Sequence, residues 1–407
     1  MSAPQLLQIG TNLGEQNDLI NMGHVDMPKF SYFKQRIRGH TLFAYEWVRH
    51  ELSSVRFGKE SSVALPRTPS ALFRCYLRIK LPQLNASSGT VAYTRQPGNA
   101  VMDELKVKIN GTTIDEQDGH FLMAWHQLTL PESKRQGYLE LVGDRSELIT
   151  PDTVIPEAYV TVPLCFWFNR ETHTVLPMGA HQKSEVRFHF KFASLSEIVI
   201  GSANLTNTNL ELDAELHTQF VHLDDEEHER MSAVPFDLLI EGVQKQEDSK
   251  QQGQVNKTEL NVGMPVKGFI FHNQPVANEE AGRKFDYTIH DGSTPFNGSE
   301  MMESALLKVY NQKYWEDSYV DYFQKVDPMS HWEGIPSVRG INTMSFAEYM
   351  AKNAPSGMMN FTQLIQVNLI QQMDTSVVNA PYTTRVYACY YKECVVAEQT
   401  FTQSWAV

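Results

Sequence analysis

The strongest constraint on the fold comes from the stretch Val160–Phe192, which is rich in aromatic residues. In its second half, apolar and polar residues alternate from Glu185 to Phe192, so four apolar side chains share one face. Successive side chains of a strand point to opposite sides of its sheet, so this alternation predicts a strand with one buried face. The first half, Val162–Phe168, is almost continuously apolar, which is typical of a strand covered on both faces. We therefore predict two strands joined by a turn around Asn169–Ala180, at the centre of an all-β sandwich.

Similar patterns recur along the rest of the chain. In the first half, residues 71–81, 105–114 and 209–223 alternate like strands, and Asn110-Gly111 predicts a hairpin turn because both residues accept positive φ. Residues 120–130 have helical spacing and precede a proline, which predicts a short helix. In the second half, we predict strands at 236–244, 258–262, 266–272, 340–346, 360–373 and from 386 onward, with loops at 247–256 and 273–301.

Many short strands with few long helices favour sandwiches or barrels over a parallel α/β sheet. The 407 residues accommodate two such units of about 180–190 residues each. The strand pattern is interrupted after Leu223 by an acidic run, Asp224–Glu227, which predicts a capped helical turn with its acids at the positive end of the helix. We place the boundary between the two units in this connector.

Charge and cysteine content exclude several classes of protein. The net charge of −13 disfavours direct binding of nucleic acid, because an acidic surface repels the phosphate backbone. The four cysteines, which are too few and too scattered for a disulfide scaffold, are expected to be buried free thiols. No stretch is long and apolar enough to span a bilayer, and the N-terminal 26 residues lack the features of a secretion signal, so we expect synthesis in the cytosol.

Several motifs, in the correct order, carry a resemblance to a known family. The segment ending Arg-Gly-His-Thr-Leu-Phe-Ala resembles the family's Arg-His-Thr-Asn-Phe-Ala, and Pro-Ser-Gly-Met-Met-Asn-Phe-Thr resembles its Pro-Ser-Gly-Thr-Cys-Asn-Phe-Ser. The matching segments are Phe33–Ala44, Glu104–Asp115, Pro163–Phe168, Leu176–Phe192, Gly340–Ala347 and Pro355–Thr362. From about Phe30 to its C-terminus, the chain resembles the double jelly-roll major capsid proteins of the nucleocytoplasmic large DNA viruses. It departs from the family in an inserted Gly39, in Cys165 in place of a proline, and in its short length.

The resemblance implies an all-β fold of two tandem eight-stranded jelly rolls, with short helices in loops and linker. It divides the chain into an N-terminal arm (1–28), a first jelly roll (29–223), an acidic helical linker (224–235) and a second jelly roll (236–407). The implied function is that of a major capsid protein, whose pseudo-hexagonal homotrimers tile the outer shell of a large icosahedral double-stranded DNA virus. The protein would then belong to the virion and assemble in the host cytoplasm.

The same resemblance implies the partners: other copies in the homotrimer, neighbouring capsomers, minor capsid or penton proteins, and the inner membrane side. We expect residues 1–26 to lie beneath the trimer, facing minor proteins or the inner membrane. We expect the long loops 85–99 and 274–295 to face outward or to contact neighbouring chains. Two other functions stay open, a transient scaffold on the immature virion membrane and a glycan-binding double jelly roll.

We expect no enzymatic activity and no catalytic, cofactor-binding or metal-binding residues. The sequence lacks the Gly-x-Ser-x-Gly, P-loop, Cys-x-x-Cys and His-Glu-x-x-His patterns. Asp103, Glu104 and Lys106 resemble a nuclease Glu-x-Lys but are interpreted as the solvent face of a strand. His222 and His228 flank four carboxylates that could hold a divalent ion, yet a solvated linker is favoured. Structural or exposed side chains are also favoured over a catalytic base or a sugar platform for the following residues: His173, His181, His189, Trp125, Trp167, Trp315 and Trp332.

Overall fold

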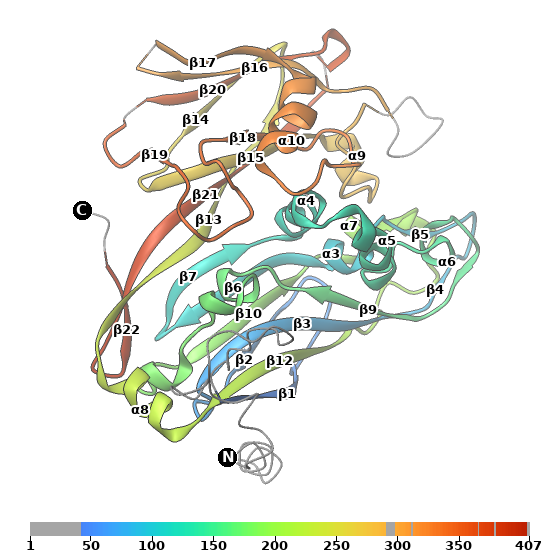
Figure 1. The fold of residues 1–407 in the computed structure, drawn as a ribbon. Helices are drawn as coiled ribbons and strands as arrows, with labels where there is room; N and C mark the ends of the chain where they lie inside the picture. Colours follow the sequence, from blue (N-terminus) through green and yellow to red (C-terminus); the bar gives the residue numbers. More distant parts are fainter. Residues whose placement is uncertain (1–41, 290–297, 311, 365, 378–379, 405–407) are drawn as a thin grey trace, which may run out of the picture.

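A computed structural model describes residues 42–289, 298–310, 312–364, 366–377 and 380–404. Two β-sandwiches of similar design lie side by side, with the first below the second in Figure 1. The fold is the double jelly roll predicted from the sequence. The expectations for residues 1–26 and for the motif around Arg38 lie outside the described residues.

The first jelly roll consists of two four-stranded antiparallel sheets. One sheet has the order β1 (Phe43–Glu51), β12 (Asp213–Leu223), β3 (Ala71–Leu81), β9 (Ala158–Pro163). The other has the order β2 (Glu60–Ala64), β10 (Val186–Phe192), β6 (Met102–Ile109), β7 (Thr112–Gln117). Two short pairs complete it, β5 (Ala92–Tyr93) with β11 (Val199–Ile200), and β4 (Leu84–Asn85) with β8 (Val154–Ile155).

The second jelly roll repeats this arrangement. Its inner sheet has the order β13 (Phe236–Gln251), β21 (Tyr382–Ala397), β15 (Pro265–Pro275), β18 (Asn342–Ser345), with β19 (Met359–Asn360) and β22 (Thr400–Gln403) pairing β15 and β21. Its other sheet has the order β14 (Val255–Leu260), β20 (Val367–Met373), β16 (Met302–Val309), β17 (Gln312–Tyr319).

Short helices connect the strands. The α-helices are α3 (Pro97–Val101), α4 (Gly119–Thr129), α5 (Glu132–Leu141), α6 (Ser146–Ile149), α7 (Leu195–Ile198), α8 (Asp225–Ala233), α9 (Val276–Glu280) and α10 (Asp327–His331). Single turns are η2 (Trp167–Asn169), η3 (Thr172–Thr174), η4 (Met178–His181), η5 (Ser202–Asn204), η6 (Tyr322–Val326) and η7 (Thr375–Val377). Helix α8 lies between β12 and β13, and Asp224 caps it by accepting a hydrogen bond of 3.0 Å from the backbone N–H of Glu227. The predicted helix at 120–130 is confirmed as α4.

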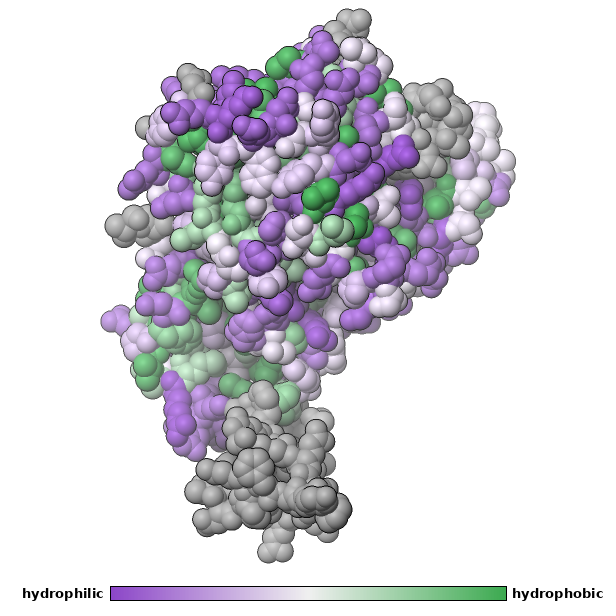
Figure 2. All heavy atoms as spheres, turned by 45° about the horizontal axis from the view of Figure 1, so that its top comes forward, coloured by the Kyte–Doolittle hydropathy of each residue, from purple (hydrophilic) through white to green (hydrophobic). Residues whose placement is uncertain are grey.

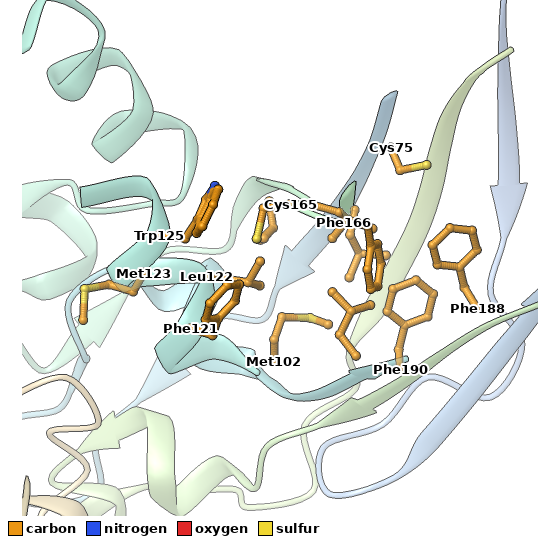
Figure 3. Packing of buried hydrophobic residues seen from close by; sticks show 14 of the residues in the cluster. Cys75, Met102, Phe121, Leu122, Met123, Trp125, Cys165, Phe166, Phe188 and Phe190 are labelled. Atoms are coloured by element: carbon orange, nitrogen blue, oxygen red, sulfur yellow. The ribbon is translucent and has the colours of Figure 1, made fainter. Parts of the chain in front are cut away.

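The alternating half of the aromatic stretch is confirmed as a strand. All four apolar residues of β10 are buried, and the three polar residues between them are half-buried on the other face. The Asn110-Gly111 turn is also confirmed, since both residues have positive φ (52° and 79°) and the turn joins β6 to β7. Figure 3 shows the resulting core, a row of buried side chains that extends from helix α4 past Cys165 and Phe166 to Phe188 and Phe190 on β10. The sandwich is therefore filled by aliphatic side chains together with a row of aromatic rings.

The continuously apolar half is only partly a strand. Strand β9 ends at Pro163, and the next residues turn into the interior, where Phe166, Trp167 and Phe168 are buried in and beside the turn η2. The carbonyl groups of this segment are satisfied by side chains, because Asn169 donates to the Leu164 carbonyl (3.0 Å) and Arg170 donates to the Cys165 carbonyl (3.1 Å). Burial on all sides therefore does not require a sheet here, and the predicted strand is wrong beyond Pro163.

Three predicted loops are also wrong in part. Residues 91–94 and 96–101 are buried, and they form β5 and α3 instead of an outward-facing loop. Residues 276–280 form helix α9, and Phe285 and Tyr287 are buried, so this part of the predicted outer loop faces inward. Residues 247–251 extend β13 and residues 255–260 form β14. The polar composition of these segments predicted loops. In the structure, parts of them form strands and helices instead.

Candidate functional site

The two outer faces of the first jelly roll differ in character, and both bear on function. On the β2-β10-β6-β7 sheet, the outer face carries charged side chains that pair with one another. Lys106 contacts Glu104 and Glu116, and Lys191 lies 2.6 Å from Asp103. Asp103, Glu104 and Lys106 are therefore engaged in surface ion pairs opposite the buried Leu105 and Val107. This arrangement confirms their interpretation as the solvent face of a strand.

The β1-β12-β3-β9 sheet instead carries three exposed rings and one half-buried ring (Tyr76) on its outer side, which we call the aromatic face: Tyr45, Trp47, Tyr76 and Tyr159. Tyr45, Trp47 and Tyr159 are 43%, 53% and 50% exposed. The rings of Trp47 and Tyr76 lie 5.7 Å apart, and the Arg78 guanidinium lies 4.3 Å above the Tyr159 ring. Exposure of large aromatic rings to water is unfavourable in free energy, so a group of them is a candidate surface for contact with another protein.

A second candidate site is the contact between the two jelly rolls. It contains a group of buried polar and aromatic residues, which we call the histidine cluster: Asp118, His120, His272, Tyr287 and Tyr387. The two histidine rings lie 5.1 Å apart, and His120 Nδ1 is 2.8 Å from the Tyr287 hydroxyl. The Tyr387 hydroxyl donates to both oxygens of Asp118 (3.0 and 2.8 Å). His120 lies on α4 and His272 on β15, so these contacts join the first jelly roll to the second.

An ion triad, Arg170, Glu241 and Lys267, forms the second polar part of this contact. Glu241 on β13 accepts from Arg170 of the first jelly roll and from Lys267 Nζ (2.6 Å), and both Lys267 and Glu241 are almost fully buried. Burial lowers the pKa of Lys267, and Glu241 opposes this shift by favouring the charged ammonium. The Arg170 guanidinium also lies 3.8 Å from the ring centre of Trp125. One carboxylate thus serves two cations from different jelly rolls.

The structure separates the other residues singled out from the sequence. His222 is 2.9 Å from Glu46, and His228 is 2.9 Å from Ser70, so the two rings face different partners. No group of three or more His, Cys, Asp or Glu side chains within the described ranges is arranged to hold a metal ion. His173 is exposed beside Glu171, and His189 is half-buried on the outer face of β10. The four cysteines are buried and free, as predicted.

The tryptophans and the remaining histidine lie in the interior. Trp125, Trp167 and Trp332 are buried and Trp315 is half-buried, which confirms the core interpretation for the first three and leaves no exposed sugar platform among them. His181 is buried against Phe401 of the second jelly roll, with ring centres 5.6 Å apart. Burial lowers the pKa of His181 to about 4.

Sequence reasoning missed the polar groups of the interdomain contact. Asp118, Lys245, His272 and Arg385 are separated by up to 267 positions along the chain, yet they surround one buried volume. Arg385 and His272 lie within strands whose residues are almost all buried, and the available signal in the sequence was an ionisable residue within or next to a predicted strand. Across the part of the chain that the structure describes, no helix has the length and hydropathy needed to span a bilayer. The face drawn in Figure 2 is largely hydrophilic, with hydrophobic residues in small groups.

Comparison with known proteins decides the family. Residues 31–224 match the family model described as the major capsid protein N-terminus, and residues 227–401 match the one described as the large eukaryotic DNA virus major capsid protein. The chain belongs to the major capsid proteins of the large eukaryotic DNA viruses. It is 24% identical to the major capsid protein of Phaeocystis pouchetii virus, over 89% of this chain and 93% of that protein. It is 26% identical to that of Pyramimonas orientalis virus, over 89% and 91% of the two chains.

Solved capsid structures share the fold of this capsid protein. A quasi-atomic model of the PBCV-1 virus capsid matches 93% of this chain and 100% of its own, with a TM-score of 0.80 and 20% identity. The Faustovirus major capsid protein matches 90% and 93% of the two chains, with a TM-score of 0.75 and 12% identity. The chain is a major capsid protein of a large DNA virus and a structural component of the virion.

Proposed function

We propose that this capsid protein forms homotrimers of pseudo-hexagonal outline, which tile the outer shell of an icosahedral double-stranded DNA virus. Each chain contributes two similar sandwiches that lie side by side, so three chains around a threefold axis present six similar lobes. In a cyclic trimer, each contact joins one surface of a chain to a different surface of the next. Neighbouring capsomers and minor capsid proteins then bind the outside of the trimer, and assembly takes place in the host cytoplasm.

The aromatic face is the observation that carries this proposal. Three of its four rings are exposed in the single chain, beside ion pairs such as Lys80 with Glu157, whereas the described strands of the other sheet carry ion pairs and no exposed large ring. Exposed aromatic clusters with neighbouring arginines are typical of protein interfaces, where burial of each ring stabilises the complex. We therefore place the contact with the next chain of the trimer on the aromatic face. The charged face stays in water or contacts neighbouring capsomers weakly.

The test compares two exposed aromatic sites. In the variant Tyr45→Ser/Trp47→Ser, we expect the trimer to dissociate to monomers at micromolar concentration, because two rings of the contact are removed. The matched control is Tyr319→Ser on β17, where an 81% exposed ring lies outside the aromatic face and the trimer should persist. The measurement is sedimentation velocity of the purified protein. A wild-type monomer would overturn the trimer, and a trimeric double variant would overturn the assignment of the contact.

We also propose that the chain divides into structural units at 224–235, and that it acts without catalytic activity. Helix α8 supports the division, since it separates the last strand of the first jelly roll from the first strand of the second. Membership of a structural capsid family supports the absence of an enzymatic role. Limited proteolysis tests the division, because a cut in 224–235 should leave two fragments that stay associated through the buried interdomain contact. Two fragments that separate spontaneously after the cut contradict it.

A further inference from the structure

The contact between the two jelly rolls contains buried histidine side chains that can gain a proton when the pH falls. Within the described residues, neither ring nitrogen of the fully buried His272 has a hydrogen-bond partner. Its ring is stacked on Tyr287, with ring centres 4.2 Å apart, and lies 5.1 Å from His120 across the contact. A neutral imidazole leaves one donor and one acceptor unpaired here, whereas an imidazolium would leave two N–H donors and a positive charge without an acceptor. Protonation therefore conflicts with the packing that joins the two sandwiches.

The charged groups around this pair are already committed to other partners. Arg385 on β21 contacts Glu247 and Glu279. Lys245 on β13 contacts Asp118 and Glu247, each within 3.0 Å. Each of these carboxylates is therefore already paired with a lysine or an arginine.

On the remaining side, Lys284 donates to the Ala100 carbonyl and lies 3.8 Å from Glu197, and Asp286 accepts from Thr288. Asp103 lies nearby and pairs with Lys191. Burial is the main cause that lowers the pKa of both histidines well below 6.5, and Arg385 adds to it.

His181 forms a similar contact at the other end of the interdomain surface. It lies on η4 of the first jelly roll and packs edge-to-face on Phe401 of β22 in the second. Both of its ring nitrogens are buried and, among the residues described, have no hydrogen-bond partner. Around it, the Phe401 N–H donates to Ser184 and Lys183 donates to the Glu398 carbonyl. Two separate places on the same contact therefore contain a histidine that packs well only when it is neutral.

We propose that these histidines make the contact between the two jelly rolls an acid-sensitive joint, which is closed when His120, His181 and His272 are neutral and opens when they are protonated. The joint opens by separation of α4 from β15 and of η4 from β22. The apolar residues between the two sheets of each sandwich stay buried, whereas apolar residues that line the contact, such as Val243 and Ile270, become exposed on opening. This proposal concerns one chain and does not depend on the proposed trimer.

The sign of the pH dependence follows from the pKa values. In the open state a histidine has a pKa near 6.5, and in the closed state its pKa is lower, so closure is fully favoured above pH 6.5 and weakens as the pH falls. At pH 5.0 each histidine shifts the equilibrium toward the open state by about 30-fold.

Asp115 acts in the opposite direction. It accepts a hydrogen bond of 2.9 Å from the Val243 N–H across the contact, and burial raises its pKa to about 6. Protonation of Asp115 therefore favours closure by roughly tenfold at pH 5.0, which offsets less than one histidine. The pKa of Glu247 is lowered by Arg385 and Lys245 despite burial, so the stability it contributes is lost only below about pH 4.5.

The test is hydrogen exchange of the full-length protein at pH 7.5 and pH 5.0, with protection factors corrected for the intrinsic exchange rate. We expect the amides of α4 to lose protection in the wild type at pH 5.0. The variant His272→Phe keeps a stacked ring and loses no hydrogen bond, so its α4 should match the wild type at pH 7.5 and be about 30-fold better protected at pH 5.0. His181→Phe should have the same effect on the amides of β22.

The matched control is His173→Phe, which replaces a side chain that is 62% exposed and lies outside the joint. It should follow the wild type at both pH values. Unchanged protection of α4 in the wild type between pH 7.5 and 5.0 overturns the proposal, as does a His272→Phe protein that loses protection like the wild type. If His272→Phe does not fold, His181→Phe and the wild-type measurement decide the matter by the same criteria.

Discussion

The interior of the first jelly roll and the contact between the two jelly rolls are both buried, but they are built from different side chains. The interior consists largely of hydrophobic side chains such as Phe166, Phe188 and Phe190, which have no exposed surface. The interdomain contact combines apolar residues with the ion triad and the histidine cluster. Apolar contacts have no preferred direction, so the interior does not require one exact arrangement of its side chains. The ion pairs and hydrogen bonds of the contact form only in one relative placement of the two sandwiches.

This difference indicates that the two regions contribute differently, the interior to stability and the contact to the relative placement of the sandwiches. Hydrophobic burial supplies stability in proportion to area and has no preferred direction, so it holds each sandwich together. A buried ion pair contributes little net stability, because desolvation costs about as much as the attraction returns, but removal of one partner is strongly unfavourable. The interdomain contact therefore favours one angle between the two sandwiches, and the proposed trimer requires this angle to be the same in every copy.

The largest effect is expected from Phe188→Ala in the interior. Removal of a fully buried ring leaves a cavity between the sheets, and the free energy of unfolding should fall by about 3–5 kcal/mol. The measurement is denaturation in urea followed by circular dichroism. The control Arg187→Ala lies next to it on β10, on the outer face with its side chain 42% exposed, and should cost less than about 1 kcal/mol. Equal losses for the two variants would contradict the assignment of the faces.

A slightly smaller effect is expected from Glu241→Gln in the ion triad. Loss of the carboxylate leaves Arg170 and Lys267 buried without an anion, which should cost about 3 kcal/mol. The loss should appear in the same urea titration. The control is Glu226→Gln in α8, where the pair with Arg230 is exposed and contributes less than about 0.5 kcal/mol. A neutral result at Glu241 would mean that the triad does not hold the two sandwiches together.

Tyr387→Phe should have an intermediate effect, with a loss of about 2 kcal/mol. Its hydroxyl donates to the charged Asp118 across the contact, and such a hydrogen bond contributes more than a neutral one. Tyr138→Phe is the matched variant inside the first jelly roll, where the hydroxyl accepts from neutral Asn99 and removal should cost about 1 kcal/mol. Only the Tyr387 variant should increase hydrogen exchange of α4. Increased exchange in both variants would show that α4 does not report on the contact.

The smallest effect is expected on the outer face of β6. Lys106→Ala removes a partner of Glu104 and Glu116, but all three groups are in contact with water. The free energy of unfolding should change by less than about 0.5 kcal/mol, and the difference should shrink at high salt. The measurement is the urea midpoint in low and high salt. A loss above 1 kcal/mol would indicate that this face is buried in the purified oligomer.

The fold could be predicted where local pattern and burial coincide. The alternation from Glu185 to Phe192 specified β10 and its buried face, and Asn110-Gly111 specified the hairpin, because both are set by nearest neighbours in sequence. The strand predicted over Leu164–Phe168 was wrong, because a continuous apolar run does not distinguish a strand covered on both faces from a turn buried on all sides.

The polar groups of the contact could not be predicted in the same way. His120 and His272 lie 152 positions apart, and no local pattern indicates that their rings meet. The polar residues of 273–289 predicted a loop, although Asn278, Lys284 and Asp286 are buried and bonded within the protein. Composition indicates the average environment of a segment, whereas the partners of an individual polar group depend on the tertiary fold.

Strand β21 links the two ends of the interdomain contact. Its 16 residues span about 50 Å at the usual rise per residue, with Arg385 and Tyr387 near one end and the turn to β22, which carries Phe401, at the other. On one edge β21 is hydrogen-bonded to β13, and on the other edge it is hydrogen-bonded to β15 as far as Tyr390 and to β22 from Cys394 onward. The backbone of this one hairpin therefore sets the distance between the two histidine sites of the contact, because His272 packs on Tyr387 and His181 packs on Phe401.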